Sequence, residues 1–292
     1  MKLVAYNTQY CKGKDGRIDV DRVVKSVADA DLIAFQEIER HWKRSGEMDQ
    51  PAEIARRLPK HHWAYGPYFD ADASTVAADG TVTNRRRQFG VMTLSRWPIL
   101  SSRLHLLPKF KTGKIFCMIA GCLETVIAAP GGALRVYNIH LNDVSPDERL
   151  AQIARLFEIL ETAPREGGIW SGHDPQWQTE PVPPMPEDAI VLGDFNSLPG
   201  SREYEAIVGP MDKDFGYGRV DVGHRLVDAW VATGHKQEDG ITFPGDAPGG
   251  KEMPCRIDYV FTTLGLASRL KSCRIDSAAP GSDHLPVWVE ME

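Results

Sequence analysis

Short apolar stretches that end in polar residues are the clearest pattern in this sequence. The segments 2–7 (KLVAYN) and 31–37 (DLIAFQE) are apolar runs typical of buried strands, and they close with Asn7 and Glu37. Between them, within 20–27, four valines follow the spacing of one helix face. The pattern therefore predicts a strand, a helix and a second strand, with a polar side chain at the end of each strand.

The same order recurs in the second half of the chain. Segment 134–142 alternates apolar and polar residues, as a strand does, and His140 lies on its polar side. Ser145 and Glu148 then form a capping box at the start of a predicted helix, and the apolar run AIVLGD ends in Asp194. Because the order occurs twice, we predict two related halves that face each other across one cleft.

Further strands are predicted between and after these two halves. They cover the segments 90–95, 114–129, 255–263 and 285–291. Many strands with few long helices indicate an α+β fold, with two packed and mostly antiparallel sheets and helices outside. Two segments, 71–88 and 170–188, are predicted to be long loops. We expect a single domain that spans residues 1–292.

Composition limits the class of protein. The chain is 42% hydrophobic and 25% charged, as soluble globular proteins are, and its net charge of −6 disfavours a protein whose main task is gripping nucleic acid. No apolar run approaches the roughly 20 residues of a membrane-spanning helix. The five cysteines are odd in number and show no CxxC spacing, so neither a zinc site nor a disulfide framework is indicated. We expect a soluble, cytoplasmic, monomeric protein without stable membrane insertion.

The polar residues at the predicted strand ends suit phosphoester chemistry. A buried carboxylate such as Asp194 must be compensated by a cation, a metal ion or water. Glu37 and Asp283 are hard oxygen donors that suit a partly hydrated Mg²⁺, or Mn²⁺, and Asn7 can add an amide oxygen directly or through water. We therefore expect a divalent metal cofactor.

Further residues are candidates for the catalytic steps. Asp194 is the candidate general base, and Asn196 would hold the attacking water or the phosphate in line. Asp258 would orient His284 and keep it charged, while His140 would supply a second donor. Each residue also has a structural explanation when taken alone; a strand-end Asp, for example, is usually a turn or helix cap.

Six short motifs in order identify a resemblance. They are YNTQY, FQEIE, NIHLN, GDFNS, RIDYVF and SDHLPV, together with the segment FGVMTLSRWPI. In this order they resemble the endonuclease/exonuclease/phosphatase family, which is similar to pancreatic deoxyribonuclease and neutral sphingomyelinases. The resemblance spans Asn7 to His284 and implies a four-layer α/β/β/α sandwich with metal-dependent phosphohydrolase activity. It assigns Asp194 and Asn196 the same roles as above.

One stretch departs from the family's deoxyribonuclease branch. That branch places a Glu just before the GVMTLS strand, where it orients the histidine at the His140 position. This chain reads NRRRQFG there, so Arg87 or Gln88 occupies the region, and Gln does not favour an imidazolium as a carboxylate would. Arg86, Arg87 and Gln88 are candidate substrate-binding residues, although a run of charges is more often a solvated loop.

Two classes of function remain open. The leading hypothesis is a metal-dependent phosphoester hydrolase: a phosphodiesterase, or alternatively a DNA endonuclease or exonuclease of the same family. A non-catalytic member that only binds a phosphorylated ligand is the other class, and the presence of every candidate acid, amide and histidine argues against it. The acidic balance favours a small soluble phosphate ester over nucleic acid. A lipid headgroup substrate would need an apolar element near the cleft, such as Trp170 and Trp177.

Overall fold

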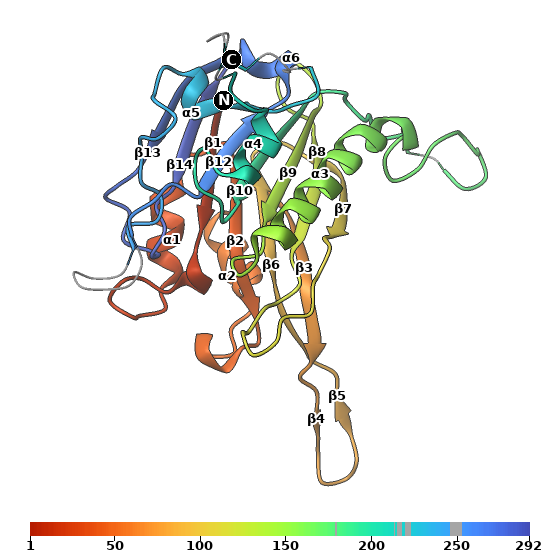
Figure 1. The fold of residues 1–292 in the computed structure, drawn as a ribbon. Helices are drawn as coiled ribbons and strands as arrows, with labels where there is room; N and C mark the ends of the chain where they lie inside the picture. The colour runs from red at the N-terminus through yellow and green to blue at the C-terminus, as the bar shows by residue number, and fades with distance from the viewer. Residues whose placement is uncertain (179, 213, 215–217, 220–222, 246–252) are drawn as a thin grey trace.

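Two six-stranded β-sheets pack face to face between two layers of helices (Figure 1). The structure is a computed structural model that describes residues 1–292 except 179, 213, 215–217, 220–222 and 246–252. The first sheet has the order β13 (Leu270–Ile275), β14 (Val287–Met291), β1 (Lys2–Asn7), β2 (Leu32–Arg40), β6 (Arg86–Ser95) and β3 (His62–Asp72). The second has the order β11 (Val227–Asp228), β12 (Asp258–Thr262), β10 (Ala189–Asp194), β9 (Leu134–His140), β8 (Gly121–Ile127) and β7 (Ile99–Leu106). The predicted four-layer sandwich is confirmed.

Helices cover the outer face of each sheet, which explains the nearly continuous apolar runs of the inner strands. Successive side chains of a strand point to opposite faces, and here both faces are buried. On β1, Leu3 and Ala5 pack between the sheets in one core cluster with Leu192 of β10. Val4 and Tyr6 point the other way, into a second cluster with the valines of α1.

The helices include the two that the sequence predicts, α1 and α3. The described helices are α1 (Val20–Val27) and α2 (Gln50–Arg57) on the first sheet, α3 (Pro146–Glu166) and α4 (Arg202–Val208) on the second, and the short α5 (Ala229–Ala232) and α6 (Leu264–Ala267), with 3₁₀ turns η1 (Gln9–Cys11) and η2 (Lys43–Ser45). Ser145 caps α3 by accepting from the backbone N of Glu148 at 3.2 Å. Glu148 does not complete the capping box, because its carboxylate accepts from the backbone N of Phe110 at 2.7 Å. Of the described helices, none has the length and hydrophobicity that crossing a membrane requires.

Two predictions are wrong: the loop predicted at 71–88 and the full length of the strand predicted at 114–129. Segment 71–88, predicted to be a loop, contains the ends of β3 and β6 and the hairpin of β4 (Thr75–Val76) and β5 (Val82–Thr83), which projects beyond the sandwich (Figure 1). Both faces of this hairpin are exposed, so it lacks the apolar alternation that reveals a strand. In segment 114–129 only β8 is a strand. The apolar residues before it lie in a loop, where several line a cleft instead of a sheet.

Each half of the chain contributes one parallel pair of strands, joined by a helix, to the sandwich. β1 pairs with β2 and places Asn7 opposite Gln36, while β9 pairs with β10 and places His140 opposite Asp194. The carboxyl ends of parallel strands meet at one edge of a sheet. Both pairs end at the lower edge in Figure 1, so polar residues from the two halves converge there.

Gly193 is required where β10 passes β9. Its φ is +143°, and a Cβ built on it would lie 2.0 Å from the carbonyl oxygen of Ile139.

We predict that Gly193→Ala lowers the free energy of unfolding by about 3 kcal/mol or more, because backbone rather than a flexible side chain must move. Urea denaturation measures the change. Gly113→Ala, which meets no atom within 4 Å, is the control and should leave stability nearly unchanged; equal effects of the two substitutions would contradict the prediction.

Candidate active site

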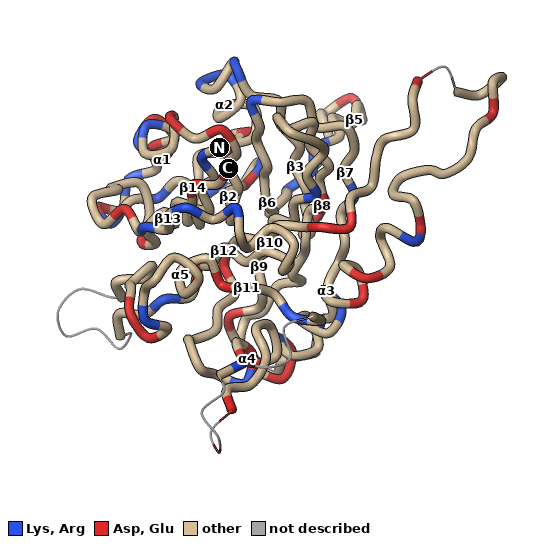
Figure 2. Tube along the Cα trace, turned by 90° about the horizontal axis from the view of Figure 1, so that it is seen from above, with Lys and Arg blue, Asp and Glu red and all other residues tan. Residues whose placement is uncertain are grey.

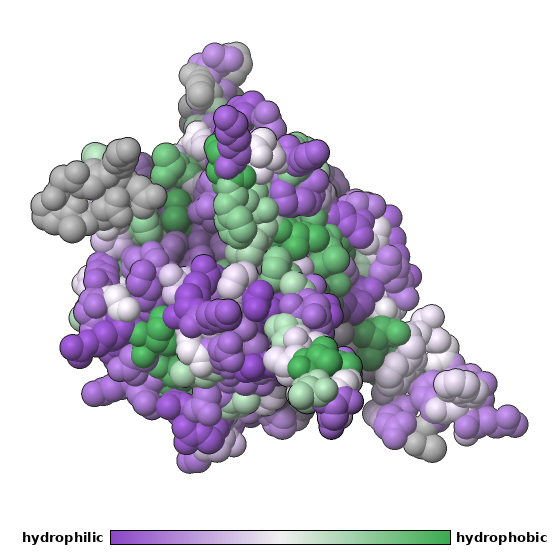
Figure 3. Space-filling view, turned by 90° about the horizontal axis from the view of Figure 1, so that it is seen from below, coloured by the Kyte–Doolittle hydropathy of each residue, from purple (hydrophilic) through white to green (hydrophobic). Residues whose placement is uncertain are grey.

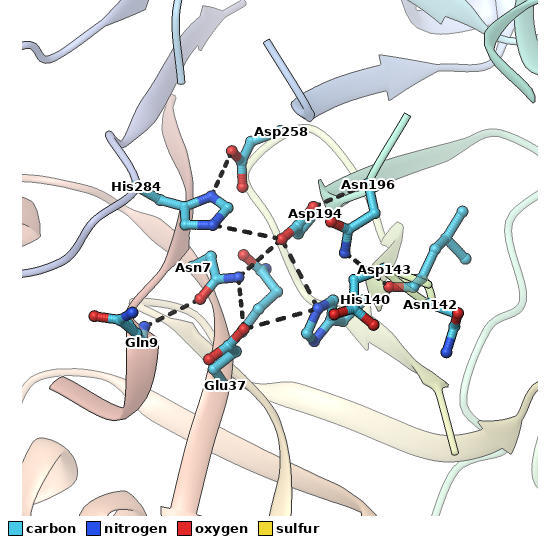
Figure 4. Close-up of polar contacts among 12 residues, drawn as sticks. Asn7, Gln9, Glu37, His140, Asn142, Asp143, Asp194, Asn196, Asp258 and His284 are labelled. Atoms are coloured by element: carbon cyan, nitrogen blue, oxygen red, sulfur yellow. Dashed lines mark hydrogen bonds and ion pairs between the residues drawn. The ribbon is translucent and has the colours of Figure 1, made fainter. Parts of the chain in front are cut away.

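Polar side chains from both sheets meet at this lower edge (Figure 4). The first sheet supplies Asn7 at the end of β1, Glu37 within β2 and the loop between β13 and β14. The second supplies the residues at the ends of β9 and β10 and at the start of β12. The structure brings together the predicted residues Asn7, Glu37, His140, Asp194, Asn196, Asp258, Asp283 and His284. In particular, Glu37 and Asp283 line the same cleft, although more than two hundred residues separate them in the sequence.

The carboxylate of Asp194 lies at the centre of the site. It is 1% exposed and accepts hydrogen bonds from the side chain of Asn7 at 2.8 Å and from the backbone N of Asn196 at 2.9 Å. The Nε2 atoms of His140 and His284 each lie 3.8 Å from its Oδ2. Burial, reinforced by the charge of Asp258, raises the pKa of Asp194 to about 6.

His284 is held as an imidazolium by Asp258. Its Nδ1 lies 2.9 Å from Oδ2 of Asp258, and Asp258 is itself fixed opposite Asp194 in the β10–β12 register. Burial alone would lower the pKa of His284, but the charge and hydrogen bond of Asp258 outweigh it and raise that pKa to about 10. The ring of Phe243 packs against the imidazole at a centroid distance of 5.0 Å. The arrangement is the one that the sequence predicts for this pair.

His140 has a partner that sequence reasoning missed. The hydroxyl of Tyr68, on β3, lies 2.8 Å from its Nδ1. Its Nε2 faces the carboxylates of Glu37 at 3.9 Å and Asp194 at 3.8 Å. This chain lacks the Glu that the deoxyribonuclease branch places before the GVMTLS strand, which indicated that His140 would have a different partner. Nothing in the local sequence pattern pointed to Tyr68.

The arginine-rich stretch does not reach the cleft. Arg86 is paired with Asp70 at 2.8 Å on the exposed extension of β3 and β6, and Arg87 lies over the ring of Trp42. The side-chain oxygen of Gln88 lies 3.4 Å from a guanidinium nitrogen of Arg40. Because none of Arg86, Arg87 and Gln88 lines the cleft, the structure does not place them as substrate-binding residues.

Strained backbone concentrates at the site. Gln9, Glu37 and Asn196 have φ values of 44°, 60° and 48°, in the left-handed region that non-glycine residues rarely adopt. Glu37 lies where the β2–β6 register shifts between Phe35 and Ile38. Such conformations persist only where the surrounding structure enforces them, and they are common at active sites. At this register shift, the side chain of Glu37 lines the cleft.

An excess of carboxylates makes the site suitable for a cation. Four acids, Glu37, Asp194, Asp258 and Asp283, share the site with two histidines. Burial raises the pKa of Asp283, and the charge of Glu37 adds to the shift although nearby His284 opposes it. Oδ1 of Asp258 is buried without a hydrogen-bond partner. A hard divalent cation fits this donor set.

The candidate donors differ in what they present to a cation. Asp194, Asp258 and His284 form a close buried cluster, but His284 already bridges both carboxylates. Glu37 and Asp283 are cleft-lining oxygen donors and are therefore the better candidates. Asn7 turns its amide nitrogen toward Glu37 and Asp194, while its oxygen accepts from the backbone N of Gln9 at 3.0 Å, so this arrangement does not present that oxygen as a ligand.

The cleft above these groups is about 900 Å³ and is mixed in character. Its described lining includes a single arginine, Arg44, which bonds the buried carboxylate of Glu39 and lies 4.2 Å above the ring of Tyr10. Another part of the wall is apolar and is formed by Phe116, Met118, Ile119, Leu198 and Phe243. Figure 3 shows several hydrophobic patches among hydrophilic side chains on this underside of the molecule. The cleft mouth is therefore neither a basic groove nor a wholly polar pocket.

The model of the Endonuclease/Exonuclease/phosphatase family matches residues 4–284. The chain belongs to this family. Among curated proteins none matches the sequence. Family membership assigns the chain to the phosphoester hydrolases, whose members include nucleases and phosphatases.

Solved structures of family proteins share the fold over the whole chain. An endonuclease/exonuclease/phosphatase from Bacteroides vulgatus is 18% identical with a TM-score of 0.67, covering 100% of this chain and 98% of that one. A mannosyl-6-phosphatase from Bacteroides thetaiotaomicron is 16% identical with a TM-score of 0.63, covering 100% and 99%. A 3′ phosphatase from Neisseria bound to a product DNA hairpin is 17% identical with a TM-score of 0.60, covering 100% and 99%. At these identities the likeness establishes the fold alone.

The buried charge of Asp194 should reduce stability. Its folded-state pKa of about 6 exceeds the ordinary value of 3.8, so the folded protein binds an extra proton between these pH values and loses stability as pH rises through them. We predict that Asp194→Asn stabilises the metal-free protein by about 1–2 kcal/mol above pH 6, and by less near pH 4. Urea unfolding in a chelator measures this.

Asp147→Asn is the matched control, because Asp147 is an exposed acid near the start of α3. It should change stability by no more than about 0.5 kcal/mol at either pH. A loss of stability in Asp194→Asn at neutral pH would show that the ionised carboxylate is fully compensated by its neighbours, contrary to the prediction.

Proposed function

We propose that this chain is a divalent-metal-dependent phosphodiesterase that hydrolyses small phosphate esters by in-line attack of water. The observation that carries the proposal is the setting of Asp194, a buried carboxylate with a raised pKa that accepts from Asn7 and faces two histidines. A general base works best when its pKa lies near the working pH, and burial moves Asp194 in that direction.

The chain's own residues divide the remaining tasks. Asp194 takes the proton of the attacking water as the new phosphorus–oxygen bond forms and the bond to the leaving oxygen breaks. His284, charged and held by Asp258, donates from Nε2 to a phosphoryl oxygen, and His140 donates from the opposite side. Asn196 is fixed by its bond to the carbonyl of Leu141 at 3.0 Å and positions the water or the phosphate.

Glu37 and Asp283 would hold Mg²⁺ or Mn²⁺. The bound cation would supply positive charge to neutralise the phosphoryl oxygens. Arg44, the single Lys or Arg of the described cleft lining, is already engaged by Glu39, and the imidazolium of His284 is paired with Asp258, so the charge of both groups is already largely balanced.

The lining of the cleft supports a small substrate over nucleic acid. A duplex needs a row of phosphate-binding cations, and the described lining has one. In the view from above, Lys and Arg alternate with Asp and Glu along the described chain instead of gathering on one side (Figure 2). The apolar wall that includes Phe116 and Leu198 suits an aromatic or aliphatic ester group on the phosphate.

Turnover should require both the metal and the general base. We predict hydrolysis of bis-p-nitrophenyl phosphate with Mg²⁺ or Mn²⁺ and loss of activity in a chelator. Asp194→Asn should reduce kcat by about 10²–10⁴-fold.

Metal binding, measured by calorimetry, should be weaker in Glu37→Gln and in Asp283→Asn. Glu161→Gln is the control and should not weaken it, because Glu161 is an exposed acid on α3.

Plasmid DNA and a panel of small phosphomonoesters and phosphodiesters complete the hydrolysis assay. If no substrate turns over and Asp194→Asn behaves as the wild type does on all of them, the proposal is wrong. Metal binding by calorimetry without any turnover would instead favour a non-catalytic protein that binds phosphorylated ligands.

The apolar wall predicts substrate preference. Among phosphodiesters with the same leaving group, we expect those with a phenyl or naphthyl second ester to have a kcat/KM about 10-fold or more above that of the methyl ester. Leu198→Ser should reduce this ratio. Leu100→Ser is the control, since Leu100 is also exposed but lies at the far end of β7 from the cleft. Equal rates for all the esters, or faster cleavage of DNA, would contradict the preference.

A further inference from the structure

Tyr68 reaches from the first sheet to the second to touch His140. It lies where the β3–β6 register shifts between Pro67 and Phe69, and its ring packs with Phe89 of β6 and with Leu123 of β8. Gly121 leaves room for it, because a Cβ on Gly121 would lie 2.6 Å from the Cβ of Tyr68 and 2.8 Å from its ring. The contact therefore depends on matched features of two strands, one from each sheet.

The hydroxyl of Tyr68 has one hydrogen-bond partner among the described residues. That partner is Nδ1 of His140, at 2.8 Å, and the tyrosine is only 5% exposed. Burial raises the pKa of Tyr68 well above its ordinary value, so the hydroxyl keeps its proton. A buried hydroxyl that keeps its proton is able to donate it to an imidazole nitrogen.

The opposite side of the imidazole decides which nitrogen carries the proton. Nε2 lies 3.8 Å from Oδ2 of Asp194. A carboxylate oxygen beside Nε2 favours a proton on that nitrogen. Nδ1 is then an acceptor, which matches the hydroxyl that lies against it.

We propose that Tyr68 is a positioning residue that donates to Nδ1 of His140 and so fixes the ring with its proton on Nε2, aimed at the substrate position. A carboxylate in the place of Tyr68 would accept from Nδ1 and favour a charged ring. The site thus pairs one histidine with a carboxylate, Asp258, and the other with a phenol. The catalytic consequence rests on the proposed function, whereas the tautomer does not.

The tautomer can be read directly by nuclear magnetic resonance. Long-range ¹H–¹⁵N correlations on metal-free protein with ¹⁵N-labelled histidine distinguish a protonated from an unprotonated ring nitrogen, at about pH 8, where an unperturbed imidazole is neutral. His140→Gln identifies the signals of His140. We expect protonated Nε2 and unprotonated Nδ1 in the wild type, and a mixture of tautomers in Tyr68→Phe. Tyr65→Phe is the matched control on the same strand, because its hydroxyl bonds the carbonyl of Ile38 and not His140.

Kinetics provide a second readout. Tyr68→Phe should lower kcat by about 10–100-fold with little change in KM, while Tyr65→Phe leaves both near the wild-type values. A protonated Nδ1 in the wild type, or an unchanged tautomer in Tyr68→Phe, would overturn the proposal. If the wild type shows the expected tautomer but hydrolyses nothing, the proposed function fails and the positioning of His140 by Tyr68 stands.

Discussion

The buried carboxylate of Asp194 is the constraint on which the rest of the site depends. A carboxylate removed from water is costly unless hydrogen bonds and opposite charges replace its solvation. Asn7 supplies a hydrogen bond from the first sheet, and the backbone of Asn196 supplies another from the turn after β10. His284 approaches from the first sheet and His140 from the second. The two halves must therefore dock in one register for this group to be tolerated.

That register is fixed behind the site by a second buried polar contact. Nε2 of Gln36, on β2, donates to Oδ1 of Asn138 on β9 at 2.7 Å. Asn138 in turn donates to the carbonyls of Phe35 and Met92 at 3.1 and 3.0 Å, across the interface between the sheets. A sliding of one sheet over the other would leave these groups unsatisfied in the core, at a cost of about 1–3 kcal/mol each. The same contacts that orient the sheets hold the catalytic candidates at fixed separations.

The sequence predicts those parts of the molecule that local pattern determines. Apolar runs predict the inner strands, and Asn7, His140 and Asp194 lie at strand ends as predicted. Glu37 does not, because β2 continues to Arg40 and Glu37 lies at a register shift within the strand. Tyr68 could not be predicted in this way, because its role depends on a register shift in β3 and on the space left by Gly121. Segment 114–120 was misread because apolar side chains that line a cleft look the same in sequence as those of a strand. Arg86 and Arg87 were misplaced because charge alone does not reveal whether a side chain at the start of a strand faces the cleft or a neighbouring group.

An acid-rich site in a protein of net charge −6 raises the question of how it holds an anionic substrate. Of the fixed positive groups, His284 faces Asp194 and is bound to Asp258, and Arg44 is bound to Glu39. A phosphate that enters therefore meets cations whose charge is already largely balanced. Under the proposed function, Glu37 and Asp283 would hold a divalent cation, which would supply the positive charge that attracts the phosphate. Substrate and metal must then each strengthen the binding of the other by the same factor, because coupling between two binding equilibria is reciprocal.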